Sequence, residues 1–256
     1  MAKLRIDKVL VERGLAESRE RAQALLLAGR VFVKGQRVDK AGALVAEDEA
    51  AIEVRGDACP YVSRGGLKLA GVLAPLAIDP SGAVCADIGA STGGFTDVLL
   101  QHGAIRVYAI DVGRGQLHQK LRTDPRVVVH EGINARFPLA EIVPEPVALV
   151  VMDVSFISLT RILGAVEKIL AHAAPAPLGA PCIVAMVKPQ FELSPREVGR
   201  GGVVRDDGLR AKAVESVVSF AATIGLRDAG RCDSPVAGPA GNREVFVKFV
   251  RTATAG

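Results

Sequence analysis

The sequence predicts an α/β protein with a doubly wound, mostly parallel sheet and a small α+β module in front of it. Strand-like apolar runs alternate with helical patterns from residue 83 onward, which is typical of a sheet covered by helices on both faces. Residues 1–60 instead combine a short helical pair with short alternating runs. The length of 256 residues suits one large core and one small one.

The module is predicted to hold two helices followed by three strands. Apolar residues recur at helical spacing within residues 4–29, with Gly14 as a stop between the two helices and Ser18 as the N-cap of the second. Residues 30–38 have the pattern of strand, turn and strand, and residues 50–54 alternate as a further strand.

A proline-containing connector over residues 57–64 separates the module from the rest, so we place the domain boundary near residue 60, giving domains 1–60 and 61–256. A helical pattern then covers residues 66–76. The strands predicted after it are residues 83–88, 106–111, 127–130, 147–153, 182–187 and 244–250, and the helices are 95–102, 160–173 and 207–224. Ligands of such a sheet bind at the carboxyl ends of its strands.

Charge is unevenly distributed along the chain. The net charge is only +4, but residues 1–40 hold ten Lys and Arg against five Asp and Glu, whereas residues 41–58 hold one against five. A clustered basic face favours a polyanion such as nucleic acid, and a solvated surface without a partner is the alternative. With no Trp and two Tyr, the chain is unlike proteins that stack single strands on aromatic platforms.

Cysteine spacing and hydropathy indicate the cellular compartment in which the protein is expected. Cys59, Cys85, Cys182 and Cys232 have no close spacing and no histidine at metal-ligand distance, so we expect no zinc and no disulfide. The first residues lack the apolar core of a signal peptide, and prolines break the uncharged stretch 169–187, so we expect a cytoplasmic protein without a membrane span.

A glycine-rich turn follows the strand at residues 83–88. Gly89, Gly93 and Gly94 precede a helix, where a ligand can approach backbone amides. Their spacing is not the dinucleotide fingerprint, and no phosphate-loop lysine follows, so a pyrophosphate ligand is disfavoured. Asp87 would repel a phosphate but suits the ammonium and sulfonium groups of S-adenosyl-L-methionine.

Two further residues complete a nucleoside pocket. Asp111 ends the next strand, where a carboxylate can accept hydrogen bonds from both ribose hydroxyls, and Asn134 follows the third strand, where it can meet an adenine edge. A capping role for Asp87, a turn at Asp111 and an ordinary loop asparagine are the alternatives. The predicted cofactor-binding residues are Asp87, Gly89, Ser91, Gly93, Gly94, Phe95, Asp111 and Asn134.

Four residues form a candidate catalytic set. Asp153 and Lys188 end neighbouring apolar strands, so they should meet, and the carboxylate can orient an amine that must lose a proton to act as a base. Lys68 can supply a second cation that favours this loss, and Glu244 can steer Lys68 or a sugar. A surface lysine and an edge-strand charge are the alternatives for the last two. The set suggests deprotonation of a sugar hydroxyl, without a metal.

The N-terminal motifs at residues 5–10, 18–22 and 29–35 resemble the S-four-type RNA-binding domain of ribosomal proteins, pseudouridine synthases and tyrosyl-tRNA synthetases. The resemblance covers about 60 residues, in line with a small module of its own. It implies that basic side chains of the second helix and the following turn contact RNA phosphates. These are Arg5, Lys8, Arg19, Arg21, Arg30 and Lys34.

Motifs in the larger part, at residues 63–69, 87–97, 152–159, 188–192, 201–206 and 241–244, resemble FtsJ-like ribose methyltransferases. The whole chain is similar to the haemolysin A (TlyA) family of bacterial rRNA 2′-O-methyltransferases. This similarity implies a Rossmann-like class I methyltransferase fold, S-adenosyl-L-methionine as cofactor, and Lys68, Asp153, Lys188 and Glu244 as a catalytic tetrad.

The same similarity implies a cytidine of rRNA within a ribosomal subunit as the target of a monomeric enzyme. Residues 192–207 would form a mobile basic lip over the substrate, or else a plain solvated loop, and residues 194–198 are its least typical part. Arg64, Arg200 and Arg205 are the further candidates for RNA contact. Two other classes stay open, a non-enzymatic RNA-binding assembly factor and a membrane-lysing protein.

Overall fold

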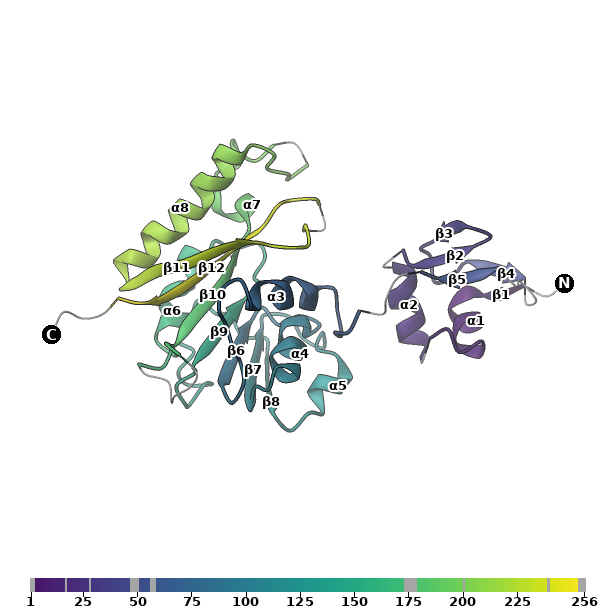
Figure 1. The fold of residues 1–256 in the computed structure, drawn as a ribbon, viewed down its shortest axis with the longest axis horizontal. Helices are drawn as coiled ribbons and strands as arrows, with labels where there is room; N and C mark the ends of the chain where they lie inside the picture. The colour runs from purple at the N-terminus through teal and green to yellow at the C-terminus, as the bar shows by residue number, and fades with distance from the viewer. Residues whose placement is uncertain are drawn as a thin grey trace. The chain divides into compact units, whose positions relative to one another are not determined.

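The computed structural model describes residues 3–16, 18–27, 29–46, 51–55, 59–172, 179–199, 201–238 and 240–252. The chain divides into two compact units, Met1–Ala58 and Cys59–Gly256 (Figure 1). Each unit has its own apolar core, so each is described by itself.

The N-terminal unit packs two helices against short antiparallel strands. Its elements are β1 Lys3–Arg5, α1 Ile6–Glu12, α2 Arg19–Leu27, β2 Val31–Val33, β3 Gln36–Val38, β4 Leu44–Ala46 and β5 Ile52–Val54. The predicted helical pair is confirmed, with Gly14 at a φ of 67° after α1 and the Ser18 hydroxyl accepting the Arg21 N–H at 3.2 Å. The strand pair β1–β4 was not predicted, because runs of three residues carry too little alternation to be recognised.

The larger unit is built on a seven-stranded sheet in the order β11-β12-β10-β9-β6-β7-β8. The strands are β6 Val84–Ile88, β7 Arg106–Asp111, β8 Val127–Glu131, β9 Leu149–Met152, β10 Cys182–Val187, β11 Leu226–Asp233 and β12 Val245–Arg251. Strands β6 to β10 run parallel, and β12 pairs antiparallel with both β10 and β11. The mostly parallel α/β fold is therefore confirmed. Because β6 lies between β7 and β9, the strand order reverses there, which is where such sheets bind ligands.

Helices cover both faces of this sheet (Figure 1). They are α3 Gly65–Leu73, α4 Gly94–Gln101 and α5 Gln119–Arg122 on one face, and α6 Leu163–Glu167 and α8 Asp207–Thr223 on the other. Strand β12 contributes side chains to the cores on both faces of the sheet. Phe246 packs in the core with α3 and α4, whereas Val247 and Phe249 pack in the core with α8. Among the described residues, no helix combines the length and apolar character that a membrane crossing requires.

Two predictions for the larger unit are wrong in their details. The helix expected at residues 160–173 is a 3-10 turn, η1 Leu159–Arg161, followed by α6, which ends at Glu167. It ends early because the chain returns to the sheet, where Leu170 bridges Val147 and the Ala171 N–H donates to the Val147 carbonyl at 2.8 Å. Strand β11 was missed because it is a charged edge strand with a bulge, so its apolar alternation is weak.

One buried amide ties the segment before α8 to the segment before β12. Asn242 is 2% exposed, its Oδ1 accepts the Val204 N–H at 2.8 Å, and its Nδ2 donates to the Gly202 carbonyl at 2.8 Å. Nearer the start of the predicted lip, residues 192–207, Glu197 forms an ion pair with Lys212 of α8. The described part of the predicted lip is thus fastened at two points.

We expect Asn242→Ala to lower the free energy of unfolding of the larger unit by about 1–3 kcal/mol, because it leaves backbone groups without partners. Asn242→Asp keeps an acceptor for Val204 but places a buried carboxylate oxygen against the Gly202 carbonyl, so at pH 7 it should be at least as destabilising as the alanine variant. Urea unfolding at pH 7 measures all three. Equal stabilities would contradict a fastening role.

Candidate functional site

The loop between β6 and α4 passes close to the backbone that follows β9. Gly89 has a φ of 87°, and a Cβ there would lie 2.5 Å from the carbonyl oxygen of Asp153. Gly93 begins α4 in the left-handed conformation with a φ of 97°. A side chain at either position would be strained or would clash, so Gly89 lets the loop lie directly against the end of β9 and Gly93 lets it lie against Leu117 and Leu121.

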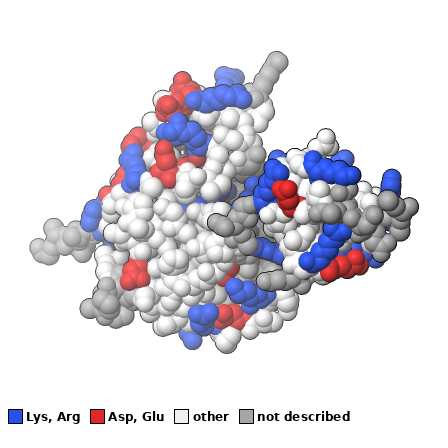
Figure 2. All heavy atoms as spheres, turned by 45° about the vertical axis from the view of Figure 1, so that its right-hand side comes forward, with Lys and Arg blue, Asp and Glu red and all other residues white. Residues whose placement is uncertain are grey.

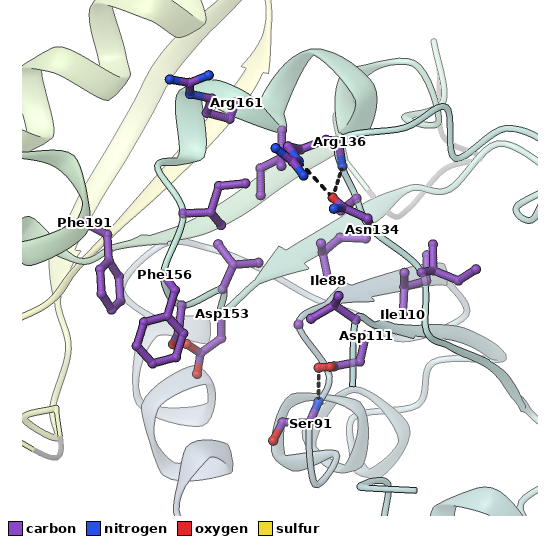
Figure 3. A pocket seen from close by; sticks show the side chains of 18 of the residues that line it. Ile88, Ser91, Ile110, Asp111, Asn134, Arg136, Asp153, Phe156, Arg161 and Phe191 are labelled. Carbon is purple, nitrogen blue, oxygen red and sulfur yellow. Dashed lines mark hydrogen bonds between the residues drawn. The ribbon is translucent and has the colours of Figure 1, made fainter. Parts of the chain in front are cut away.

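Asp111, at the end of β7, holds this loop in place. Its Oδ2 accepts the Ser91 N–H at 2.8 Å (Figure 3) and its Oδ1 accepts the Gly113 N–H at 2.6 Å. Asn134 accepts both the backbone N–H and the Nε–H of Arg136, at 3.1 and 3.2 Å. Each carboxylate oxygen has a second lone pair, so Asp111 keeps acceptor capacity for a ligand.

A cavity of about 810 Å³ opens between these residues and the loop after β9. Of the predicted cofactor-binding residues, Gly89, Ser91, Asp111 and Asn134 line it, and Ile88 and Ile110 supply apolar wall (Figure 3). Its size lies within the usual range for a small-molecule pocket, and its mixture of apolar walls and few polar groups is typical of one.

Asp87, which the sequence suggested as a partner of a cationic cofactor or else as a capping carboxylate, is completely buried and lines neither of the cavities of about 810 and 260 Å³. Its Oδ2 accepts the N–H and the hydroxyl of Thr96 at 2.9 and 2.7 Å, but its Oδ1 is buried without a hydrogen-bond partner. Burial, with added repulsion from Asp153 and Asp111, raises the pKa of Asp87 to about 7. A cation bound nearby would stabilise the charged form, so the residues fit a cationic cofactor such as S-adenosyl-L-methionine.

Two ion pairs lie beyond the glycine loop. Lys188, 8% exposed at the end of β10, has its Nζ 2.6 Å from Oδ1 of Asp153, because β9 and β10 are neighbouring parallel strands that end at the same edge. Lys68 of α3 donates to Glu244 Oε2 at 2.5 Å, joining residues far apart in sequence just before β12. Lys68, Asp153 and Lys188 all line a second cavity of about 260 Å³.

The structure therefore brings all four candidate catalytic residues into two contacts. Gly94 and Phe95, from the predicted cofactor set, line the second cavity, and the Phe95 ring packs on Phe246 with centroids 6.0 Å apart. Gly93 instead packs near α5, since a Cβ there would meet Leu117 and Leu121.

Three residues beside the pairs were not predicted. The Lys188 Nζ also donates to Ser155 Oγ at 2.8 Å. Phe156 is 91% exposed at a φ of 65°, and its ring lies 5.3 Å from that of Phe191 (Figure 3). All three line the large cavity. Ser155 and Phe156 belong to the motif at residues 152–159, but residue type alone gave no signal, because their roles depend on where the loop after β9 turns.

Glu192 links the two loops that carry the catalytic candidates. Its carboxylate accepts the Ser158 hydroxyl at 2.5 Å and the Leu159 N–H at 2.9 Å. Burial raises the pKa of Glu192, and these hydrogen bonds partly offset the effect. The segment after β9 is thereby fixed to α7 Pro189–Glu192, which directly follows Lys188.

In the N-terminal unit, a buried carboxylate organises two of the predicted RNA-binding residues. Asp7 is 0% exposed and accepts from Arg5 and Arg19 at 3.0 Å and from Gln23 at 3.1 Å. Hydrogen bonding to Arg5 is the main reason why the pKa of Asp7 lies below its usual range. The two arginine side chains stay 44% and 45% exposed, so they are held in place and still open to solvent.

The other predicted RNA-binding residues differ in exposure. Lys8 and Lys34 of the N-terminal unit and Arg64 and Arg205 of the larger unit are exposed, and Arg21 is half-buried. Arg30 is also half-buried, with a buried Nη1 that has no hydrogen-bond partner. Figure 2 shows lysine and arginine side chains spread over the N-terminal unit with fewer acidic ones between them. Arg200 lies outside the described residues.

Comparison with known proteins establishes the family. Residues 61–251 match the model of the FtsJ-like methyltransferases and residues 4–50 match the S4 domain. Over 250 residues the chain is 46% identical to the 16S/23S rRNA (cytidine-2'-O)-methyltransferase TlyA of Mycobacterium tuberculosis, a match that covers 98% of the chain and 90% of the relative. The chain belongs to the TlyA family of FtsJ-like methyltransferases.

Two further relatives of this TlyA-family chain carry the hemolysin name. Hemolysin A of Brachyspira hyodysenteriae is 40% identical over 248 residues, covering 96% of the chain and 100% of the relative. A solved Streptococcus thermophilus protein described as a hemolysin has a TM-score of 0.75 and 40% identity, covering 99% of the chain and 90% of that structure. The predicted resemblance to this family, with an S4 domain and an FtsJ-like methyltransferase domain, is confirmed.

We expect Asp7→Asn to destabilise α1 and α2 by about 1–3 kcal/mol at pH 7, because Arg5 and Arg19 lose a charged acceptor. The native pKa of Asp7 is depressed, so its stabilisation is present above the unfolded pKa and is lost as the pH falls. The difference between wild type and variant should therefore be largest above the unfolded pKa of about 4 and should shrink progressively as the pH falls below it. Urea unfolding followed by pulsed hydrogen exchange reports the two helices.

Glu12→Gln, an exposed carboxylate change on the same helix, is the matched control and should leave stability at pH 7 nearly unchanged. An Asp7→Asn effect no larger than that of the control would contradict the anchoring role.

Asp87→Asn should change how stability depends on pH. Because the native pKa of about 7 lies above the usual 3.8, the folded protein holds a proton that the unfolded chain has lost, and stability falls as the pH rises through this window. The variant lacks the carboxyl group and therefore lacks this pH-dependent loss of stability. Between pH 5 and pH 8, the free energy of unfolding of the variant minus that of wild type should increase by about 1–3 kcal/mol. Parallel pH profiles in urea unfolding would contradict the assignment.

Proposed function

We propose that the protein transfers a methyl group from S-adenosyl-L-methionine to the 2′-hydroxyl of a cytidine in ribosomal RNA. The observation that carries the proposal is the 2.6 Å contact between Lys188 and Asp153 at two neighbouring strand ends, beside the glycine loop. It provides an amine next to a nucleoside-sized pocket. The TlyA relative, named as a 16S/23S rRNA (cytidine-2'-O)-methyltransferase, supports the choice of RNA, base and position.

The cofactor would lie in the large cavity, with the glycine loop, Ser91, Asp111 and Asn134 around its nucleoside part. Asp87 lines neither cavity, so it would act on the cationic part only at a distance, through its charge. When bound, S-adenosyl-L-methionine supplies an electrophilic methyl group on a sulfonium centre. Asp111 and Asp153 lie close enough to Asp87 to raise its pKa, so these carboxylates would contribute a negative field that favours a cationic ligand over a phosphorylated one.

Lys188 would act as the base that removes the 2′-hydroxyl proton. Asp153 orients its amine and stabilises the ammonium that forms, and Lys68 lines the same small cavity. Glu244 holds Lys68 in place. Most of the acceleration would come from positioning the two reactants, which supplies about 7–11 kcal/mol in favourable cases.

The RNA would be held by both parts of the chain. In this proposal residues 1–60 form the RNA-binding domain and residues 61–256 the methyltransferase domain. Arg5 and Arg19, fixed by Asp7 and still half-exposed, present guanidinium groups suited to phosphate oxygens. The exposed ring of Phe156, packed against the half-buried ring of Phe191, offers an apolar surface at the rim of the pocket. We propose a monomer that acts in the cytoplasm on ribosomal subunits.

We expect Lys188→Ala to reduce methyl transfer by at least about 100-fold, because general base catalysis contributes about 10²–10⁴-fold. Labelled S-adenosyl-L-methionine and ribosomal subunits from cells lacking the protein provide the assay, and mapping of ribose methylation identifies the nucleotide. Cofactor affinity by calorimetry should change little, since Lys188 contacts the acceptor side.

Lys168→Ala, an exposed lysine after α6, is the matched control and should retain wild-type transfer. Equal transfer by Lys188→Ala and wild type would refute the assigned base. A wild-type protein that binds RNA but neither binds the cofactor nor transfers methyl groups would instead be a non-enzymatic assembly factor. Leakage of lipid vesicles at the assay concentration, without transfer, would indicate a membrane-lysing protein.

A further inference from the structure

We propose that Ser155 is a positioning residue that sets the direction of the lone pair on Lys188. This inference rests on the proposed function, in which Lys188 is the base. The Lys188 Nζ donates to Ser155 Oγ at 2.8 Å and lies 2.6 Å from Asp153 Oδ1. Ser155 follows Asp153 by two residues in the loop after β9, so one loop supplies both oxygen atoms.

The tetrahedral geometry of the Lys188 amine explains why two acceptors are needed to fix the direction of its lone pair. A neutral amine has two N–H bonds and one lone pair in a tetrahedral arrangement around Nζ, and an ammonium has three N–H bonds and no lone pair. When one N–H points at Asp153 and the other at Ser155, the lone pair must occupy the remaining position. With Asp153 alone, rotation about the Cε–Nζ bond leaves two equivalent positions for the lone pair.

The surroundings indicate where the remaining position faces. Ser155 and Asp153 line both the large and the small cavity, and Lys188 lines the small one. The other charged residue lining the small cavity is Lys68, which is itself engaged by Glu244. Because Lys188 is 8% exposed, the cavity is its main opening, and a ribose hydroxyl placed there meets the lone pair.

The proton and electron balance of the step is simple. The O–H bond of the ribose breaks and its proton joins the Lys188 lone pair, while the ribose oxygen forms a bond to the methyl carbon and the electrons of the sulfur–carbon bond stay on sulfur. The resulting ammonium has three N–H bonds, of which Asp153 and Ser155 accept two. The third proton faces the cavity and leaves to water after product release.

The test compares Ser155→Ala with Ser155→Thr in the full-length protein. We expect the alanine variant to lose about tenfold in kcat, since it removes one hydrogen bond to the base, with the KM values for cofactor and ribosomal subunits within about twofold of wild type. The loss should be the same at pH 7 and pH 9, because orientation and not ionisation is affected. The threonine variant keeps the hydroxyl and should recover most of kcat. Cofactor affinity by calorimetry should be unchanged in both.

Ser216→Ala, on the exposed side of α8, controls for a serine change away from the pocket and should match wild type. A wild-type kcat for Ser155→Ala would overturn the inference, and so would a loss of equal size in the threonine variant, which would indicate packing and not a hydroxyl contact. If wild type transfers no methyl group, the proposed function fails before Ser155 is tested, so the two failures are distinguishable.

Discussion

The ion pair between Lys188 and Asp153 is the contact on which the rest of the site depends. An ammonium removed from water is costly unless a carboxylate and further acceptors lie next to it, and the parallel pairing of β9 with β10 brings that carboxylate to the same sheet edge. Any shift in register would leave Lys188, at 8% exposure, without its partner. Glu192 stabilises this arrangement, because its hydrogen bonds join the loop after β9 to the helix after β10.

Around this pair, acidic side chains gather near the glycine loop and basic side chains line the small cavity. Three carboxylates converge near the glycine loop, and the one that is fully buried, Asp87, has its pKa raised to about 7 by burial and by its neighbours. Lys68 and Lys188 line the small cavity, together with Asp153, which pairs with Lys188. In the proposed function, the carboxylates would favour a cationic donor and Lys188 would supply the amine base. The glycines at 89 and 93 let the loop lie close to its neighbours, because any larger residue would push the loop away from β9 or α5.

Much of this arrangement could be predicted from the sequence, because strand ends and glycines carry local signals. Asp153 and Lys188 each follow an apolar run, and parallel strands end at one edge, so their meeting follows from topology. The contacts of Ser155 and of Asp7 carry no such signal: the first depends on how the loop after β9 turns, and the second joins residues 12 and 16 positions apart. Strand β11 was missed for a related reason, since an edge strand needs no continuous apolar run.

The two units use buried ion pairs for different purposes, and the exposure of the cation decides which. In the N-terminal unit only the anion is buried, so Arg5 and Arg19 are fixed at one end and remain about 45% exposed, with capacity for a second acceptor. In the larger unit both partners of the Lys68–Glu244 pair are buried, at 11% and 1% side-chain exposure. Such a lysine is poorly placed to bind a phosphate from solvent, and Glu244 at 2.5 Å holds its amine at the small cavity that Lys188 also lines. Arginines anchored by an aspartate are thus open to solvent in one unit, whereas the lysine anchored by a glutamate is confined to the small cavity in the other.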